Sequence, residues 1–114
     1  MSCKNIYHKS AEGYLAVADG IARKTLVFEE KTLLCEFILQ KGKKLPLHQH
    51  PEEQTGYLVS GHIILQVADD HYDMHAGDSW AIPGNVEHAA DILEDSVAIE
   101  VFSPVRQDYV SCDS

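Results

Sequence analysis

His48 and His50 are separated by a single residue, a spacing that suggests metal binding. A third histidine, His88, follows later in the chain. A β-strand sends alternate side chains to one face, so a His-x-His pair in an extended segment presents two imidazoles together, with Cα atoms about 7 Å apart. Imidazole is the commonest protein ligand for divalent transition metals. Such pairs also occur on polar strand faces, so the prediction of a metal site depends on the residues around the pair.

Two further side chains near the pair offer oxygen ligands. Gln54 shares the strand parity of His48 and His50, and its amide oxygen can coordinate a metal. Glu52 has the same parity and a better ligand atom, although the bend expected at Pro51 makes parity unreliable there. Three other histidines, His62, His71 and His75, are interpreted as solvated side chains at a turn or beside glycines.

Glu100 interrupts the apolar run VAIEVF and shares its strand face with Ala98 and Phe102. An ionised carboxylate on such a face has to be paired, metal-bound or protonated. Arg106 follows closely and is the candidate partner. The pair is either a salt bridge at the rim of the fold or a general acid/base beside a cation that binds substrate.

Composition limits the kind of protein. With 114 residues, 45% of them hydrophobic, the chain should form one domain over residues 1–114, in which 1–20 form an edge or swapped strand and 110–114 a flexible tail. The net charge of −9 argues against partners such as nucleic acid or anionic membrane. No span-length apolar stretch and no signal-peptide core are present, so the chain is expected to be cytoplasmic. The three cysteines lack a CxxC pair, and Cys35 lies in an apolar run.

Short apolar and β-branched segments separated by turn residues predict an all-β protein, a barrel or sandwich of antiparallel strands. The two runs TLVF and TLLCEFIL contain more apolar side chains than one small lumen can bury, which predicts a homodimer. Strands are expected within Lys24–Glu30, Lys31–Gln40, Thr55–Asp70, Asp78–Pro83 and Ser96–Phe102. The range Thr55–Asp70 is expected to contain two strands, divided at Ser60–Gly61.

The glycine, histidine and proline spacing from Gly42 to His88 resembles the two motifs of the cupin superfamily. That resemblance implies a small antiparallel β-barrel of the double-stranded jelly-roll type and one divalent metal ion per chain. Gln54 stands where the first motif usually has Glu, and Asn85 where the second usually has Gly. Asparagine tolerates a positive φ, so the Gly84–Asn85 turn can still form.

The segments HQHPEEQ, IPGNVEH and EVFSPVRQDY are similar to the KdgF-like subgroup of small cupins, which is associated with pectin degradation. The resemblance implies metal ligands at His48, His50, Gln54 and His88, with Ni, Zn, Mn or Fe as the ion. It also implies Glu100, in place of an aspartate, as the catalytic acid/base, and Arg106 as the residue that binds the substrate carboxylate.

The activity implied by this resemblance is ring opening and ketonisation of an unsaturated sugar acid, with a small anionic substrate such as a uronate. The protein would then be a metal-dependent isomerase. Two alternatives share the same ligand set, because fold alone does not fix function: an iron-dependent cupin dioxygenase, and a non-catalytic module that binds or senses a small molecule.

Overall fold

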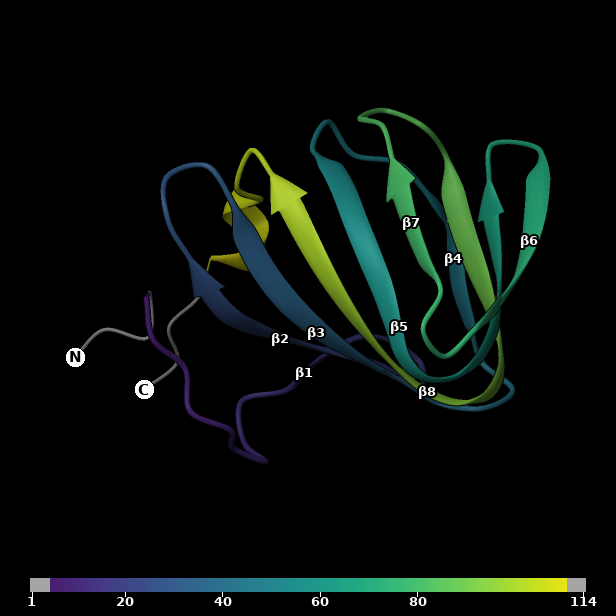
Figure 1. Cartoon of the computed structure of the whole chain (residues 1–114), viewed down its shortest axis with the longest axis horizontal. Helices are drawn as coiled ribbons and strands as arrows, with labels where there is room; N and C mark the ends of the chain where they lie inside the picture. The colour runs from purple at the N-terminus through teal and green to yellow at the C-terminus, as the bar shows by residue number, and fades with distance from the viewer. Residues whose placement is uncertain (1–4, 111–114) are drawn as a thin grey trace.

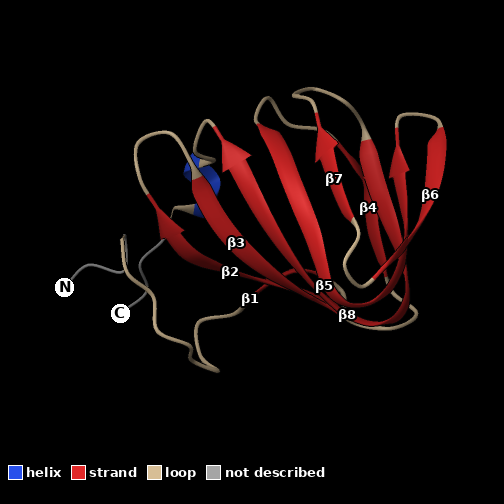
Figure 2. Ribbon diagram, in the orientation of Figure 1, coloured by secondary structure: helices blue, strands red, loops and turns tan. Residues whose placement is uncertain are grey.

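The computed structural model describes residues 5–110, and within them the chain is built from antiparallel strands (Figures 1 and 2). No helix in this part of the chain is long and apolar enough to cross a membrane. The elements are β1 (Leu15–Ala18), β2 (Ile21–Phe28), β3 (Leu33–Leu39), β4 (Lys44–His48), β5 (Glu53–Val67), β6 (Asp70–His75), β7 (Ser79–Ile82), β8 (His88–Ser103) and the 3-10 helix η1 (Gln107–Tyr109).

Strands β5 and β8 are long enough to run through both halves of the fold. The first half of β5 pairs with β7 and with the second half of β8, which also pairs with β3. The second half of β5 pairs with β6 and with the first half of β8, which also pairs with β4. The sheet folds over along these two strands, as Figure 1 shows, and its concave face becomes the interior.

The predicted jelly-roll fold is confirmed, with one difference in detail. The segment expected to be divided at Ser60–Gly61 is a single strand, β5, bent at register shifts between Leu58 and Ile63. Gly61 has φ 99°, and a Cβ there would overlap Ser96. All eight described strands therefore belong to one sheet, ordered β1-β2-β3-β8-β5-β6 with β4 on β8 and β7 on β5, and no pairing among them closes it into a ring.

Alternation along β3 places one set of side chains in the interior. Leu33, Cys35, Phe37 and Leu39 are all buried, whereas the residues between them are at least partly exposed. Burial raises the pKa of the Cys35 thiol to about 11, so this cysteine is the buried small hydrophobe that its sequence context indicated. The same apolar layer continues across the concave face and supports the candidate site.

The N-terminal part of the chain supplies an edge strand. β1 pairs with β2 of the same chain, with Leu15 opposite Arg23 and Ala16 opposite Ala22. The preceding segment is held by Lys24, whose ammonium group donates to the Tyr7 hydroxyl at 2.6 Å. Of the tail expected at 110–114, all but Val110 lies outside the described residues.

Candidate metal centre and its cavity

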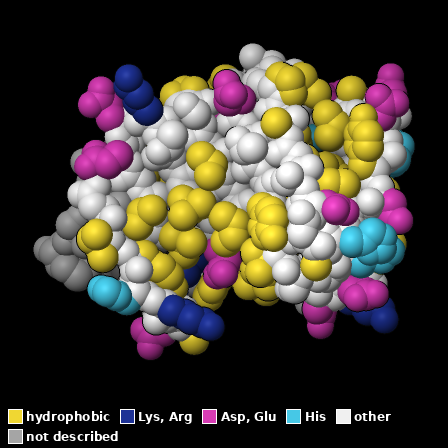
Figure 3. All heavy atoms as spheres, in the orientation of Figure 1, with side chains coloured by type: hydrophobic (Ala, Val, Ile, Leu, Met, Phe, Trp, Pro, Cys, Tyr) yellow, Lys and Arg dark blue, Asp and Glu magenta, His cyan; other side chains and the backbone are white. Residues whose placement is uncertain are grey.

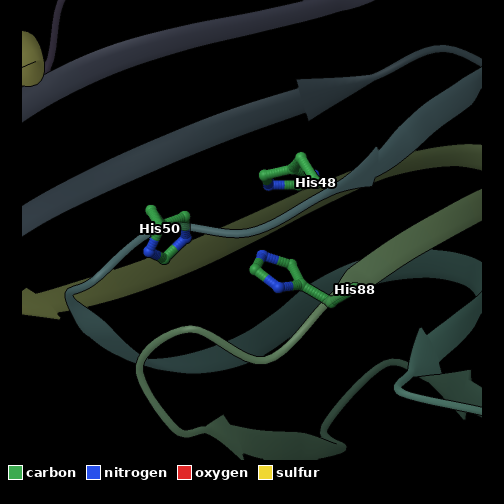
Figure 4. Close-up of side chains that lie close together, drawn as sticks. All are labelled: His48, His50 and His88. Atoms are coloured by element: carbon green, nitrogen blue, oxygen red, sulfur yellow. The ribbon is translucent and has the colours of Figure 1, made fainter.

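The three histidines singled out from the sequence come together at one end of the concave face. His48 ends β4, His88 begins β8, and the two are register partners, while His50 lies in the turn after β4. The ring centroids of His48 and His88 are 4.2 Å apart, and those of His50 and His88 are 5.0 Å apart. One ring nitrogen from each histidine lies within 4.8 Å of the other two (Figure 4).

Each imidazole is oriented by its own backbone. The Nδ1 atom of each ring lies at hydrogen-bond distance from a carbonyl oxygen two residues away in the chain. Because a carbonyl only accepts, Nδ1 carries the proton and Nε2 keeps its lone pair, which is the tautomer that binds a metal through Nε2. The accepting carbonyls are those of Pro46 for His48 (2.8 Å), Glu52 for His50 (2.8 Å) and Val86 for His88 (2.9 Å).

Burial also favours the uncharged rings that a metal requires. It lowers the pKa of His48 and lowers that of His88 to about 4, in both cases by more than the backbone hydrogen bond raises it. A neutral imidazole offers its lone pair near pH 7, whereas an imidazolium cannot. This set of nitrogen donors fits a divalent transition metal.

Gln54, the candidate fourth ligand, lies against the histidine group through a contact with His50. The Gln54 Oε1 atom lies 2.8 Å from His50 Nε2. With the proton on Nδ1, both of these atoms are acceptors, and two lone pairs facing each other at this distance repel. Neighbouring ligands on an octahedral ion at about 2.1 Å are themselves about 3 Å apart, so the separation of these two acceptors matches that of two ligands of one cation.

Glu52, the alternative oxygen ligand, lies on the other side of the His50 ring. Its Oε1 is 3.5 Å from Nδ1, the ring nitrogen that points away from Gln54. It also lies 3.9 Å from Arg106 Nε. The structure thus places Gln54 next to the ring nitrogens that converge, and Glu52 behind them.

Glu100 projects from β8 into the same region. It is 9% exposed, and its Oε1 accepts hydrogen bonds from the Gln54 amide at 3.1 Å and the Trp80 indole at 3.2 Å. Burial raises its pKa to about 7, and these hydrogen bonds offset only part of the effect. A Cβ at Gly56, opposite Glu100 in the register, would overlap both Trp80 and the Glu100 carboxylate.

Arg106 has other partners than the one its sequence position suggested. Its guanidinium donates to Asp108 at 3.2 and 2.7 Å and stacks on the Tyr109 ring, 3.8 Å from the centroid. Among the described residues its acidic neighbours in ion-pair range are Asp108 and Glu52. The candidate Glu100–Arg106 salt bridge is therefore not formed.

A cavity of about 270 Å³ joins these groups. Its walls include two of the histidines together with Gln54, Glu100 and Arg106, and the remaining lining is mostly apolar, from residues such as Leu45 and Phe102. Two lining residues were not identified as functional from the sequence. These are Trp80, a strand residue whose sequence context does not distinguish core from pocket wall, and Tyr109, which η1 brings over the cavity only through tertiary folding.

The two histidine segments are tied directly to each other. The Asn85 N–H donates to the His50 carbonyl at 2.7 Å, and Asn85 has φ 63°, so the turn expected with asparagine in place of glycine does form. This bond connects the loop before β8 to the loop after β4. The position of His50 relative to His88 is fixed by it.

Comparison with known proteins identifies the family of the chain. The model of the cupin domain matches residues 35–103. The chain is 27% identical to the pectin degradation protein KdgF of Dickeya dadantii (strain 3937) over 96 residues, which is 82% of this chain and 87% of that protein.

Solved structures show the same relationship. KdgF from Halomonas sp. superposes with a TM-score of 0.86 at 27% identity, covering 93% of this chain and 98% of its own. An RmlC-like cupin from Shewanella frigidimarina superposes with a TM-score of 0.87 at 26% identity, covering 94% and 96%. The match of the family model to more than half of the sequence, on a jelly roll that carries the three clustered histidines, shows that this chain belongs to the cupin family.

Proposed function

We propose that this cupin catalyses the metal-assisted ring opening and ketonisation of a 4,5-unsaturated sugar acid. The observation that carries the proposal is the position of Glu100, a buried carboxylate in the wall of the cavity that also holds the histidine group and Arg106. The similarity to KdgF, whose name refers to pectin degradation, indicates the substrate class, because pectin is a polymer of uronates.

The reaction is an isomerisation, so it requires proton movement and no oxidant. The anomeric hydroxyl loses a proton, the bond between C1 and the ring oxygen breaks to give an aldehyde and an enolate, and C4 of the enolate gains a proton to give the ketone. Glu100 is the group in the cavity that we assign to this proton transfer. A positioned carboxylate of this kind contributes roughly a hundredfold to ten-thousandfold in rate.

Gln54 and Trp80 hold the Glu100 carboxylate in place. Both donate to Oε1, which leaves Oε2 with no protein hydrogen bond among the described contacts and available for the substrate. Gln54 has a second role, because its Oε1 points to the histidine group while its Nε2 points to Glu100. A glutamate at position 54 could not donate in its ionised form, so the amide suits this arrangement.

Arg106 is the residue that we assign to the substrate carboxylate. Its planar guanidinium lines the cavity and is fixed by Asp108 and by the Tyr109 ring. Guanidinium groups bind carboxylates in a two-bond geometry that orients the ligand. The substrate carboxylate on C5 would thus be held at the cavity wall, with the reacting carbons toward Glu100.

His48, His50, His88 and Gln54 are the residues that would hold one divalent metal ion. Because none of these ligands is charged, a bound ion keeps its full positive charge and supplies Lewis-acid stabilisation of negative charge on substrate oxygens. The ring orientation fixed by the backbone carbonyls holds the ligand set ready for that ion.

The test follows the conjugated-alkene absorbance of a 4,5-unsaturated galacturonate. The metal-loaded wild type should accelerate its loss, and Glu100→Gln should be about a hundredfold to ten-thousandfold slower with unchanged metal content. Glu53→Gln, which removes an exposed carboxylate next to Gln54, is the matched control. No acceleration by the wild type would refute the proposal. Oxygen consumption with a diketone would instead identify a dioxygenase, and binding without turnover a sensor.

A further inference from the structure

A second group of metal-ligating side chains lies on β5 and β6. It consists of His62, Asp73 and His75, each with a ligand atom within 4.8 Å of those of the other two. The sequence alone favours an interpretation of the two histidines as separate solvated side chains. We propose that the three residues form a second, surface metal site for a late first-row divalent ion such as Zn²⁺, Ni²⁺ or Cu²⁺.

The strand register brings the three side chains to one face. His62 is directly opposite His75 in the antiparallel β5–β6 ladder, so both project to the same side. Asp73 precedes His75 by two residues on β6 and shares that side. The intervening pair, Ile63 and Met74, projects to the other side, where Ile63 is buried and lines the cavity. The group is therefore separated from the cavity by the sheet itself.

The ligand atoms already converge on one another. The two imidazoles stack with centroids 4.1 Å apart and planes 19° from parallel. His62 Nε2 lies 2.5 Å from Asp73 Oδ1, and His75 Nε2 lies 3.2 Å from Oδ2. One carboxylate thus orients both rings so that the same nitrogen of each faces a common point. These contacts also lower the pKa of Asp73, with the His62 hydrogen bond as the largest cause, and this favours the ionised ligand.

A bound ion would replace the protons in these hydrogen bonds. In the hydrogen-bonded state Nε2 of each ring donates to Asp73, and on binding each proton moves to Nδ1 or to solvent, which frees the Nε2 lone pair. Ligands at about 2.1 Å in a tetrahedral site are about 3.4 Å apart. The His62–Asp73 contact therefore has to widen from 2.5 Å, and all three ligand atoms start within 4.8 Å of one another. The His75 and Asp73 side chains are 59% and 60% exposed, which leaves room for this adjustment and for water at the remaining positions.

The electrostatic surroundings favour a cation. The chain has a net charge of −9, and the Asp78 carboxylate accepts from the backbone N–H of His75 at 2.8 Å. On the face shown in Figure 3, histidine side chains lie beside Asp and Glu side chains at the β6 end of the molecule. Clustered negative charge raises the local cation concentration.

Zn²⁺ titration of metal-stripped protein by calorimetry tests the proposal, with four proteins that separate the two sites. The wild type should bind two equivalents, His50→Ala one, His62→Ala one, and the double variant none. His71→Ala is the matched control, because His71 lies on the same face of β6 outside the group and should bind as the wild type does. Zn²⁺ should also raise the Tm of His50→Ala and not that of the double variant.

Two results would overturn the second site: a His50→Ala variant that binds no Zn²⁺, or a His62→Ala variant that binds as many equivalents as the wild type. His62→Asn provides a second variant, with a smaller change in side-chain volume, if the alanine variant unfolds. The proposal is independent of the proposed activity, because the uptake of Zn²⁺ by His50→Ala is measured without substrate.

Discussion

Replacing Glu100 by glutamine should stabilise the protein at neutral and alkaline pH while removing most of the proposed activity. Burial raises the pKa of Glu100 from 4.5 to about 7, against the smaller opposing effect of hydrogen bonds from Trp80 and Gln54. A glutamine at this position keeps an oxygen that can accept both hydrogen bonds, and it has no charge to desolvate. The buried carboxylate of Glu100 thus lowers the stability of the fold at neutral pH, while it is the group proposed to act in catalysis.

The size of the effect follows from the pKa. A carboxyl group with a folded-state pKa above its unfolded value contributes stability below the unfolded pKa, and that contribution is lost as the pH rises through the folded pKa. For Glu100 this window runs from pH 4.5 to about 7. At 1.36 kcal/mol per pKa unit, the wild type should lose about 3 kcal/mol of unfolding free energy relative to Glu100→Gln across the window.

Urea unfolding at a series of pH values measures this difference. Chelator-treated protein should be used, so that metal binding does not contribute to stability. Glu53→Gln is again the control, since it removes one charge from an exposed position of the same sheet. A difference between wild type and Glu100→Gln that stays constant from pH 4.5 to pH 8 would refute the reasoning, because it would mean that Glu100 is not a buried carboxyl with a raised pKa.

Four further predictions concern the metal, the substrate, the chain end and the assembly. His50→Ala should lose one equivalent of metal relative to the wild type by elemental analysis; equal content would contradict the ligand assignment. Arg106→Gln should raise KM for an anionic substrate by about 10- to 150-fold with unchanged metal, since hydrogen bonds to charged groups contribute about 1.5–3 kcal/mol; an unchanged KM would exclude the assigned role. Burial raises the pKa of Asp108, but the hydrogen bond and charge of Arg106 are the main opposing causes and the net pKa lies below the ordinary 3.8. Asp108 therefore stabilises the fold above pH 3.8 and loses this effect as the pH falls through its lower folded pKa. Asp108→Asn should therefore reduce stability by about 0.5 kcal/mol at pH 7 and by less near pH 3 in urea unfolding, because the Asp108 carboxylate is largely exposed; a loss that persists unchanged near pH 3 would refute it. Exposed apolar side chains such as Ile38 and Val59 predict a homodimer, and a monomeric mass in sedimentation at micromolar concentration would contradict it.

The convergence of the three histidines was predictable in part from local rules and in part from the resemblance to the cupin motifs. Strand parity places His48 and His50 near each other, and the glycine and proline frame around His88 identifies the turn that leads into β8. Asn85 takes the positive φ that its side chain tolerates. The meeting of His88 with the other two histidines depends on the pairing of β4 with β8, and it was predicted from the resemblance to the two cupin motifs.

The other features depend on register, which the sequence does not specify. The bend in β5 near Gly61 keeps one strand where two were expected. The register of the hairpin formed by β5 and β6 places His62 opposite His75. The stacking of Arg106 on Tyr109 depends on how η1 packs over the cavity, so the sequence distance to Glu100 suggested a partner that the fold does not provide. Side chains from distant strands meet only after the sheet has folded over.

The most direct test of the proposed function is proton NMR of a 4,5-unsaturated galacturonate during turnover by the metal-loaded protein. The account predicts that the vinyl C4–H signal disappears and that a C4 methylene signal beside a C5 ketone replaces it, at a rate that Glu100→Gln lowers by about a hundredfold or more. A vinyl signal that decays no faster with the protein than without it would contradict the proposal.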